Sequence, residues 1–127
     1  MRYTLLLHYP EMSAADLGPE ALAEGMREFD DYAKALDAAG VLRSAEVLQP
    51  SEVTTTVTAA DGTLRVQDGP YADTKEQLGG TFVIEVDDLD QAIGWAGKAP
   101  SVRWGAVEIR PVGTRFVDGA WTAYDHR

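Results

Sequence analysis

The chain has 127 residues, a formal net charge of −10 at pH 7, 45% apolar residues and no cysteine. This length predicts one domain over residues 1–127 with a core of its own. The acidic balance argues against nucleic acid and anionic membrane surfaces as partners. The lack of cysteine excludes disulfides, thiolate nucleophiles and cysteine-bound metals. Because the N-terminus does not resemble a signal peptide and no run approaches the ~20 apolar residues of a membrane span, we expect a cytoplasmic protein.

The first two predicted elements are a strand and a helix. Arg2–Tyr9 is a short apolar run that stops at Pro10. Gly18-Pro19 is typical of a helix start, and Gly40 is typical of a helix end. Steps of three and four define an apolar helix face made of Leu22, Met26, Phe29, Ala33 and Leu36.

The rest of the chain predicts strands, one hairpin and a second helix. Strands are expected over Val41–Leu48, Gly79–Val86 and Ala106–Val112. Asp61-Gly62 predicts a β-hairpin between the runs on either side of it. The second helix begins after a cap at Asp87 or Asp88, and one of its faces carries Leu89, Ala92, Ile93 and Ala96. Residues 113–127 form a C-terminal tail in which a second Asp-Gly pair suggests a small hairpin.

This order predicts an α+β fold, a ferredoxin-like split β-α-β sandwich with an extra β-hairpin. Two helices then cover one face of the sheet. Alternation along the strands assigns to the helix side Tyr3, Leu5, Leu7, Phe82, Ile84, Val86, Val107 and Ile109. The other face is mixed and carries Leu6, Val83, Ala106, Val112, Arg2, His8, Glu85, Glu108 and Arg110. Such a face suits a wet cavity, a paired sheet or a plain solvated surface.

The stretch that begins "DGPYADTKEQLGGTFVIEV" at Asp68 resembles the DGPF-type proteins of the YCII-related family, as do the opening "MRYTLLLHY" and "AAGVLRSAEVLQP". The resemblance implies a dimeric α+β barrel, in which two copies pack their open sheet faces as a homodimer. Some more distant YCII-like proteins are dehydrochlorinase-type enzymes with a His–Asp pair. Their first helix carries an R-x-x-H pattern. Here Arg27 matches the arginine, but Phe29 and Asp30 stand where the histidine would lie. DGPF-type proteins also tend to be encoded beside extracytoplasmic-function sigma factors.

Candidate catalytic residues gather around His8, at the end of the first strand. Antiparallel pairing brings that end close to the segment before Gly79, so we expect His8, Asp68, Tyr71, Lys75 and Glu76 to share one cleft rim. His8 would act as base, Asp68 would orient it, Tyr71 would donate a hydrogen bond, and Lys75 would steady negative charge. The structural alternative is a hydrogen-bonded histidine at a strand end beside an ordinary Asp-Gly-Pro-Tyr turn.

Two further segments have competing interpretations. Asp73 with Glu76 and Thr74 with Gln77 have capping-box spacing, which predicts one helical turn. Lys75 then either neutralises an anionic ligand or forms a surface salt bridge.

At the opposite end of the mixed face, Arg2, Glu85, Glu108 and Arg110 predict cross-strand ion pairs or a polar cavity floor. Glu76, Glu85, Glu108 and Arg110 are the candidate substrate-binding residues. The second histidine, His126, lies in the tail, and the sequence offers no metal or cofactor motif.

Two functions therefore remain open. The first is binding or transformation of a small organic molecule, aromatic or anionic, by cofactor-free acid–base chemistry in a cleft of a homodimer. The second is a non-catalytic regulatory partner associated with an extracytoplasmic-function sigma factor.

Overall fold

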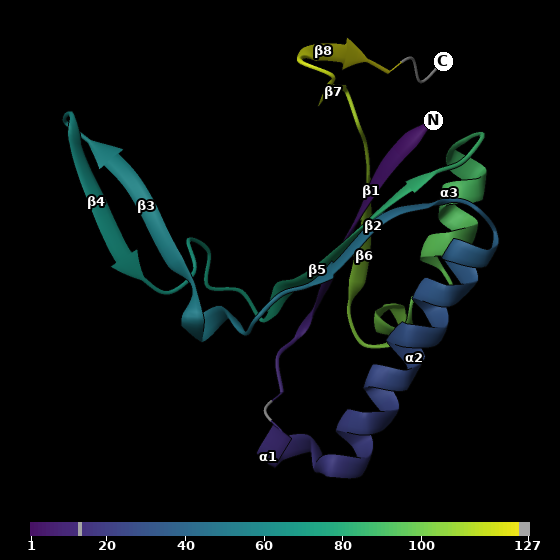
Figure 1. Cartoon of the computed structure of the whole chain (residues 1–127). Helices are drawn as coiled ribbons and strands as arrows, with labels where there is room; N and C mark the ends of the chain where they lie inside the picture. Colours follow the sequence, from purple (N-terminus) through teal and green to yellow (C-terminus); the bar gives the residue numbers. More distant parts are fainter. Residues whose placement is uncertain (13, 125–127) are drawn as a thin grey trace.

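The computed structural model describes residues 1–12 and 14–124, so His126 lies outside the described residues. A four-stranded antiparallel sheet, in the order β2-β5-β1-β6, is covered by the helices on one face (Figure 1). The sheet strands are β1 (Arg2–Pro10), β2 (Leu42–Val47), β5 (Glu76–Glu85) and β6 (Ala106–Pro111). The helices are α1 (Ala14–Leu17), α2 (Pro19–Ala38) and α3 (Leu89–Ala96), with 3₁₀ turns at Ser51–Val53 and Pro100–Arg103.

The sheet has the predicted ferredoxin-like topology. β1 lies in the interior of the sheet and pairs antiparallel with both β5 and β6. β2 pairs antiparallel with the other edge of β5. The two crossovers therefore place α2 and α3 on the same face, as the right-handed rule requires. The α+β fold class is confirmed.

The core lies between the sheet and the helices. Its buried side chains are Tyr3, Leu5, Leu7, Tyr32, Leu36, Phe82, Ile84, Val86, Ala92, Ala96 and Ala99. Each large apolar side chain buried there contributes about 1.5–3 kcal/mol. The Tyr32 hydroxyl donates a 2.8 Å hydrogen bond to the Trp95 carbonyl, which ties α2 to α3. Burial raises the pKa of Tyr32 well above its ordinary value.

The predicted apolar face of α2 is buried only in its C-terminal half. Leu36 is fully buried, and Phe29 and Ala33 pack against the core. Leu22 and Met26 are exposed because the first turns of α2 run past the ends of β5 and β6 (Figure 1). The predicted helix is confirmed over all five residues, and burial is confined to the three in its C-terminal half.

No helical turn forms at residues 73–77, so the helical turn predicted from the capping-box spacing was wrong. β5 begins at Glu76, and its pairing with β1 extends to Pro10 opposite Glu76. The Thr74 hydroxyl donates to the Glu76 carbonyl at 2.6 Å, and the Gln77 amide donates to the Thr74 carbonyl at 3.0 Å. Pairing with an adjacent strand outweighs the local capping preference.

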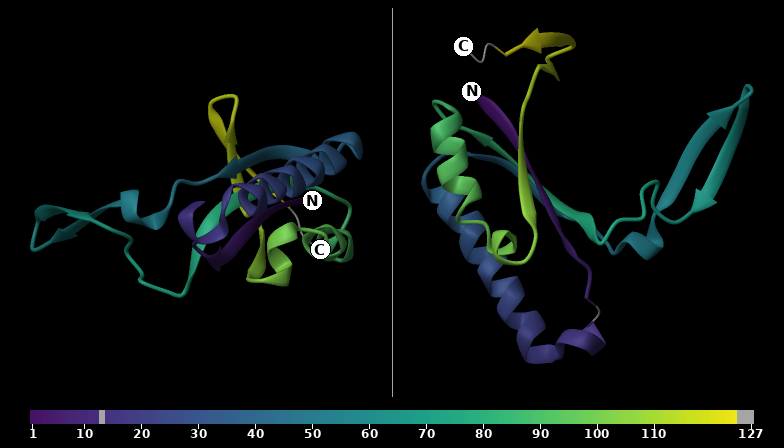
Figure 2. Two further views of the ribbon diagram at one scale, coloured as in Figure 1. Left: turned by 90° about the horizontal axis from the view of Figure 1, so that it is seen from below. Right: turned by 180° about the vertical axis from the view of Figure 1, so that it is seen from behind.

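Two hairpins stand outside the main sheet. β3 (Thr55–Ala60) and β4 (Thr63–Asp68) form an arm that projects from the side of the sheet opposite the helices (Figure 2). Its turn has positive φ at Asp61 (52°) and Gly62 (75°), as a type I′ turn needs. β7 (Thr114–Val117) and β8 (Ala120–Ala123) form a tail hairpin around Asp118-Gly119, with φ of 52° and 79°.

Among the described residues, no helix is both long enough and apolar enough to cross a bilayer.

Candidate functional site

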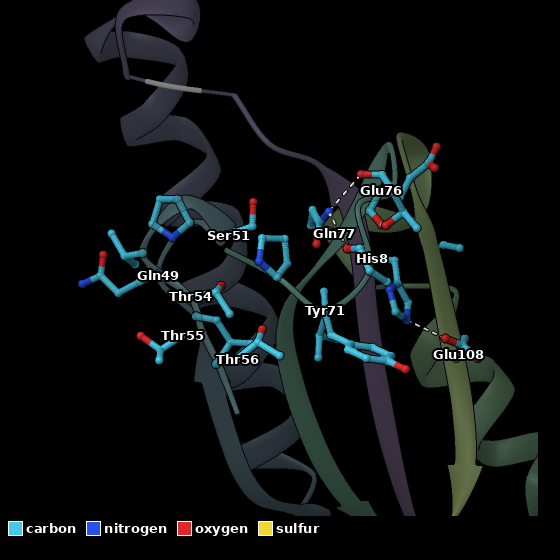
Figure 3. Close-up of a pocket in the computed structure, with 18 of the residues that line it drawn as sticks. His8, Gln49, Ser51, Thr54, Thr55, Thr56, Tyr71, Glu76, Gln77 and Glu108 are labelled. Atoms are coloured by element: carbon cyan, nitrogen blue, oxygen red, sulfur yellow. Dashed lines mark hydrogen bonds and ion pairs between the residues drawn. The ribbon is translucent and has the colours of Figure 1, made fainter. Parts of the chain in front are cut away.

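The main groove of the molecule has a volume of about 1110 Å³ and lies where the arm leaves the sheet. The open face of the sheet forms one wall with His8, Ala106 and Glu108. The base of the arm and the chain leading into β5 form the other walls. Figure 3 shows His8, Tyr71 and Glu108 on one side of the groove, with Gln49, Thr54, Thr55 and Thr56 on the other.

A β-bulge shapes the wall beside His8. Leu7 pairs with Gly80, whereas His8 pairs with Leu78, so Gly79 is the extra residue of β5. A Cβ at Gly79 would overlap the ring of Tyr9, which packs between Phe29 (ring centroids 6.4 Å apart) and Trp104 (6.2 Å). Tyr9 thus fills the helix side, and alternation turns His8 toward the groove. Burial, together with the nearby Glu11 carboxylate, raises the pKa of Tyr9.

His8 has a carboxylate partner. Its Nε2 lies 2.5 Å from Oε1 of Glu108, on the neighbouring strand β6. Nε2 is shielded from solvent, and its geometry with Glu108 is not that of an aligned hydrogen bond, so the pair is a close contact between an imidazole and a carboxylate. An imidazole held beside a carboxylate can accept and return a proton near neutral pH.

The structure places the predicted rim residues in two groups. Tyr71 and Glu76 line the groove with His8, and the Tyr71 side chain is 85% exposed. Asp68 and Lys75 do not line it. Asp68 is paired with Thr55 at the end of β4, inside the arm. The expectation that all five residues share one rim is corrected for these two, and the carboxylate beside His8 is that of Glu108.

The predicted cluster at the opposite end of the face also needs a correction. Arg2 lies 3.6 Å from Glu85, and Arg43 lies 3.7 Å from the same carboxylate. Glu108 is not part of this cluster, because it pairs with Leu6 at the His8 end of β1. Arg110 is opposite Thr4 in the β1–β6 ladder. Of the four predicted substrate-binding residues, Glu76 and Glu108 line the groove, whereas Glu85 and Arg110 do not.

Sequence reasoning missed the opposite wall. The run Thr54–Thr56 and Gln49 supply hydroxyl and amide groups to the groove. A three-threonine run a few residues after the predicted strand end at Leu48 was the available signal, because connecting segments at sheet ends often build binding sites.

The chemistry of the lining is polar and without fixed positive charge. None of the described residues that line the groove is lysine or arginine, and two are glutamates. Within residues 1–12 and 14–124, no three His, Asp or Glu side chains are grouped closely enough to hold a metal ion. Hydroxyls, amides, the imidazole and the Tyr71 ring are the groups that could contact a ligand.

Comparison with known proteins gives a consistent result. The model of the YCII-related domain matches residues 1–115. The chain is similar to the uncharacterized protein R00369 of Rhizobium meliloti (strain 1021), with 30% identity over 114 residues. That alignment covers 88% of this chain and 92% of the relative.

Proposed function

Because the chain belongs to the YCII-related family, whose model covers residues 1–115, we propose that it binds and transforms a small organic molecule by cofactor-free acid–base chemistry in the groove beside His8. The observation that carries this proposal is the His8–Glu108 pair at the wall of a groove of about 1110 Å³. This volume lies just above the range of about 300–1,000 Å³ that is usual for small-molecule sites, so the groove has room for such a ligand. The working unit in this proposal is a homodimer.

His8 is the proton-transfer group. Its Nε2 is occupied by Glu108, so Nδ1 is the nitrogen left for a ligand in the groove. The contact with the Glu108 carboxylate holds the imidazole ring in place. Tyr71 supplies a hydroxyl that can donate to a ligand oxygen. In an isomerisation, His8 would take a proton from one carbon and return it to another. In an elimination, His8 would take the proton while the leaving group departs from the neighbouring carbon with its bonding electron pair.

The lining supports a neutral ligand, and an aromatic one in particular. An anion would meet Glu76 and Glu108 without a lysine or arginine on the wall. A neutral aromatic molecule could stack on the Tyr71 ring and use the threonine hydroxyls. We therefore favour the aromatic half of the sequence-based hypothesis over the anionic half.

The test is a screen of neutral aromatic fragments by NMR chemical-shift mapping, followed by His8→Gln and Glu108→Gln. We expect bound fragments to shift the resonances of His8 and Tyr71. Each variant should lower fragment binding, and should lower turnover about 10²- to 10⁴-fold, the typical contribution of a proton-transfer group to the rate.

Asp90→Asn is the matched control, because it neutralises an exposed carboxylate of α3 on the helix-covered side of the sheet. It should leave binding unchanged. Equal binding by wild type and His8→Gln would refute the proposed site.

The regulatory alternative remains a prediction. The net charge of −10 is compatible with a basic protein partner. Co-purification of a sigma factor, weakened by salt, would support this alternative. It makes no use of His8, so His8→Gln should not change such binding.

A further inference from the structure

Two hairpins of this chain each expose an apolar face that none of the described residues covers. In the arm, Val57 pairs with Val66, and Ala59 pairs with Leu64. Directly opposed residues share a face, so these four side chains form one apolar surface, while Thr56, Thr58, Arg65 and Gln67 form a polar one. Val57, Leu64 and Val66 are 57%, 67% and 63% exposed. A two-stranded hairpin is only marginally stable alone, which favours a partner for this surface.

The tail hairpin has the same feature. Phe116 pairs with Trp121, and their ring centroids are 5.3 Å apart. The two side chains are nevertheless 59% and 71% exposed. Large exposed aromatic pairs of this kind are typical of interfaces.

The two hairpins lie at opposite ends of the open sheet face. The arm begins at the His8 end, where Val57 lines the groove. The tail hairpin is anchored at the other end. There, Arg115 donates a hydrogen bond to the Tyr124 hydroxyl at 3.3 Å. This hydrogen bond lowers the pKa of Tyr124, and the nearby Arg2 and Glu85 also affect that pKa. Both hairpins are visible beyond the main sheet in Figure 1.

Charge is divided between the same two ends. The groove end carries Glu76 and Glu108 without arginine or lysine among the described lining residues. The other end gathers three arginines, Arg2, Arg43 and Arg115, around Glu85. A fourth, Arg110, lies opposite Thr4 on the neighbouring strand β6. In a chain of net charge −10 this basic cluster stands out. If two sheets pack face to face with antiparallel β1 strands, the acidic end of each lies over the basic end of the other.

We propose that in such a two-fold homodimer the tail hairpin of each copy packs Phe116 and Trp121 against the apolar face of the other copy's arm, and thereby closes the groove beside that copy's His8. The occupant is a second copy because this chain carries both complementary surfaces, and a two-fold axis brings them together twice. The inference rests on the homodimer of the proposed function. It adds Phe116 and Trp121 of the second copy as groove walls that govern ligand specificity.

Disulfide cross-linking tests the contact directly, because the wild-type chain has no cysteine. A chain with Leu64→Cys is mixed with a chain with Trp121→Cys and mildly oxidised. We expect a covalent dimer that contains one of each chain. The control mixture pairs Leu64→Cys with Asp90→Cys, since Asp90 is an exposed residue of α3 on the helix-covered side. Equal cross-linking in the two mixtures would overturn the proposal.

Light scattering of Trp121→Ser provides the second measurement. Loss of a buried aromatic side chain from an interface should raise the dimer dissociation constant about tenfold or more. Leu89→Ser, which removes a 49% exposed apolar side chain from α3, should leave it unchanged. A monomeric wild type would overturn the proposal and would leave both surfaces to a different protein.

The two proposals fail in different ways. If Trp121→Ser keeps the wild-type dimer and the wild-type fragment affinity, the hairpin contact is refuted. The effect of His8→Gln on fragment binding would still stand in that case, and the acid–base proposal with it.

Discussion

Replacing Gly105 by alanine would disturb the fold and the candidate site at once. Gly105 immediately precedes β6, where the chain passes close to the backbone of β1. A Cβ at this position would overlap the carbonyl oxygen of His8 and lie 2.9 Å from the Cα of Tyr9. These are backbone atoms of a central strand, so they cannot move aside by a change of rotamer. The start of β6 must instead move away from β1.

The expected cost is about 2–3 kcal/mol, the upper range for forcing an extra methyl group into a packed site. For 127 residues, an unfolding entropy of about 2.1 cal/mol/K per residue gives about 0.27 kcal/mol/K. A cost of 2 kcal/mol therefore lowers Tm by about 7 °C. The same displacement weakens the pairing of His8 with Ala106 and moves Glu108 away from His8.

Urea denaturation and calorimetry at one fixed protein concentration provide the measurements. Gly94→Ala is the matched control, because nothing lies within 4 Å of a Cβ at Gly94, inside α3. There the same substitution should stabilise the protein by about 0.5–1 kcal/mol through helix propensity. If the free energy of unfolding of Gly105→Ala lies within about 0.5 kcal/mol of the wild-type value, as for an ordinary surface substitution, the close approach of β6 to His8 is refuted.

Three further perturbations test other contacts. Tyr32→Phe removes the 2.8 Å hydrogen bond to the Trp95 carbonyl and should cost about 1 kcal/mol in urea denaturation, whereas Tyr71→Phe should cost nothing. Burial raises the pKa of Tyr32, so the native state keeps the hydroxyl proton at a pH at which the unfolded state loses it. The free energy of unfolding should therefore fall as pH rises above about 10, the ordinary pKa of tyrosine. This fall should be less steep in Tyr32→Phe, which has no such proton. Asp88→Ala removes the acceptor that caps α3 at 2.9 Å from the Gln91 amide and should cost about 1 kcal/mol, unlike Asp90→Ala. Gly79→Ala should destabilise the wild type but much less a Tyr9→Ala background, since the added Cβ meets the Tyr9 ring; additive effects in that double-mutant cycle would contradict the packing of Tyr9 on Gly79.

The fold was largely predictable because its signals are local. Pro19 and Gly40 lie at the two ends of α2, and Gly40 has the left-handed φ of 76° expected of a helix stop. Asp61-Gly62 forms the predicted hairpin turn for the same reason. Period two placed Tyr3, Leu5 and Leu7 in the core correctly, because an open sheet with helices on one face buries alternate residues.

The candidate site was less predictable because it depends on register. Sequence order gives the neighbours of β1, but not which residue of β6 lies beside which residue of β1. A shift of a few residues decides whether Glu108 joins His8 or Arg2, and the structure pairs it with His8. Likewise, no local pattern reports that Asp68 pairs with Thr55 at the base of the arm, where it does not line the groove. The buried Tyr32 was missed because tyrosine serves both core and surface positions.

The Gly79 bulge is one reason why the residues that line the groove were difficult to predict from the sequence. By period two, Leu78 and Glu76 would share the helix side of β5 with Gly80 and Phe82. The extra residue reverses this order, because Leu78 becomes the partner of His8 and Glu76 the partner of Pro10. Both side chains then line the groove instead of the core. A bulge beside a candidate site is a common way to redirect side chains, and here it brings an apolar contact and a carboxylate to the wall that holds His8. Gly79 and Gly80 are therefore best explained by the β-bulge that turns Leu78 and Glu76 toward the groove, and not by a turn that only ends the preceding loop.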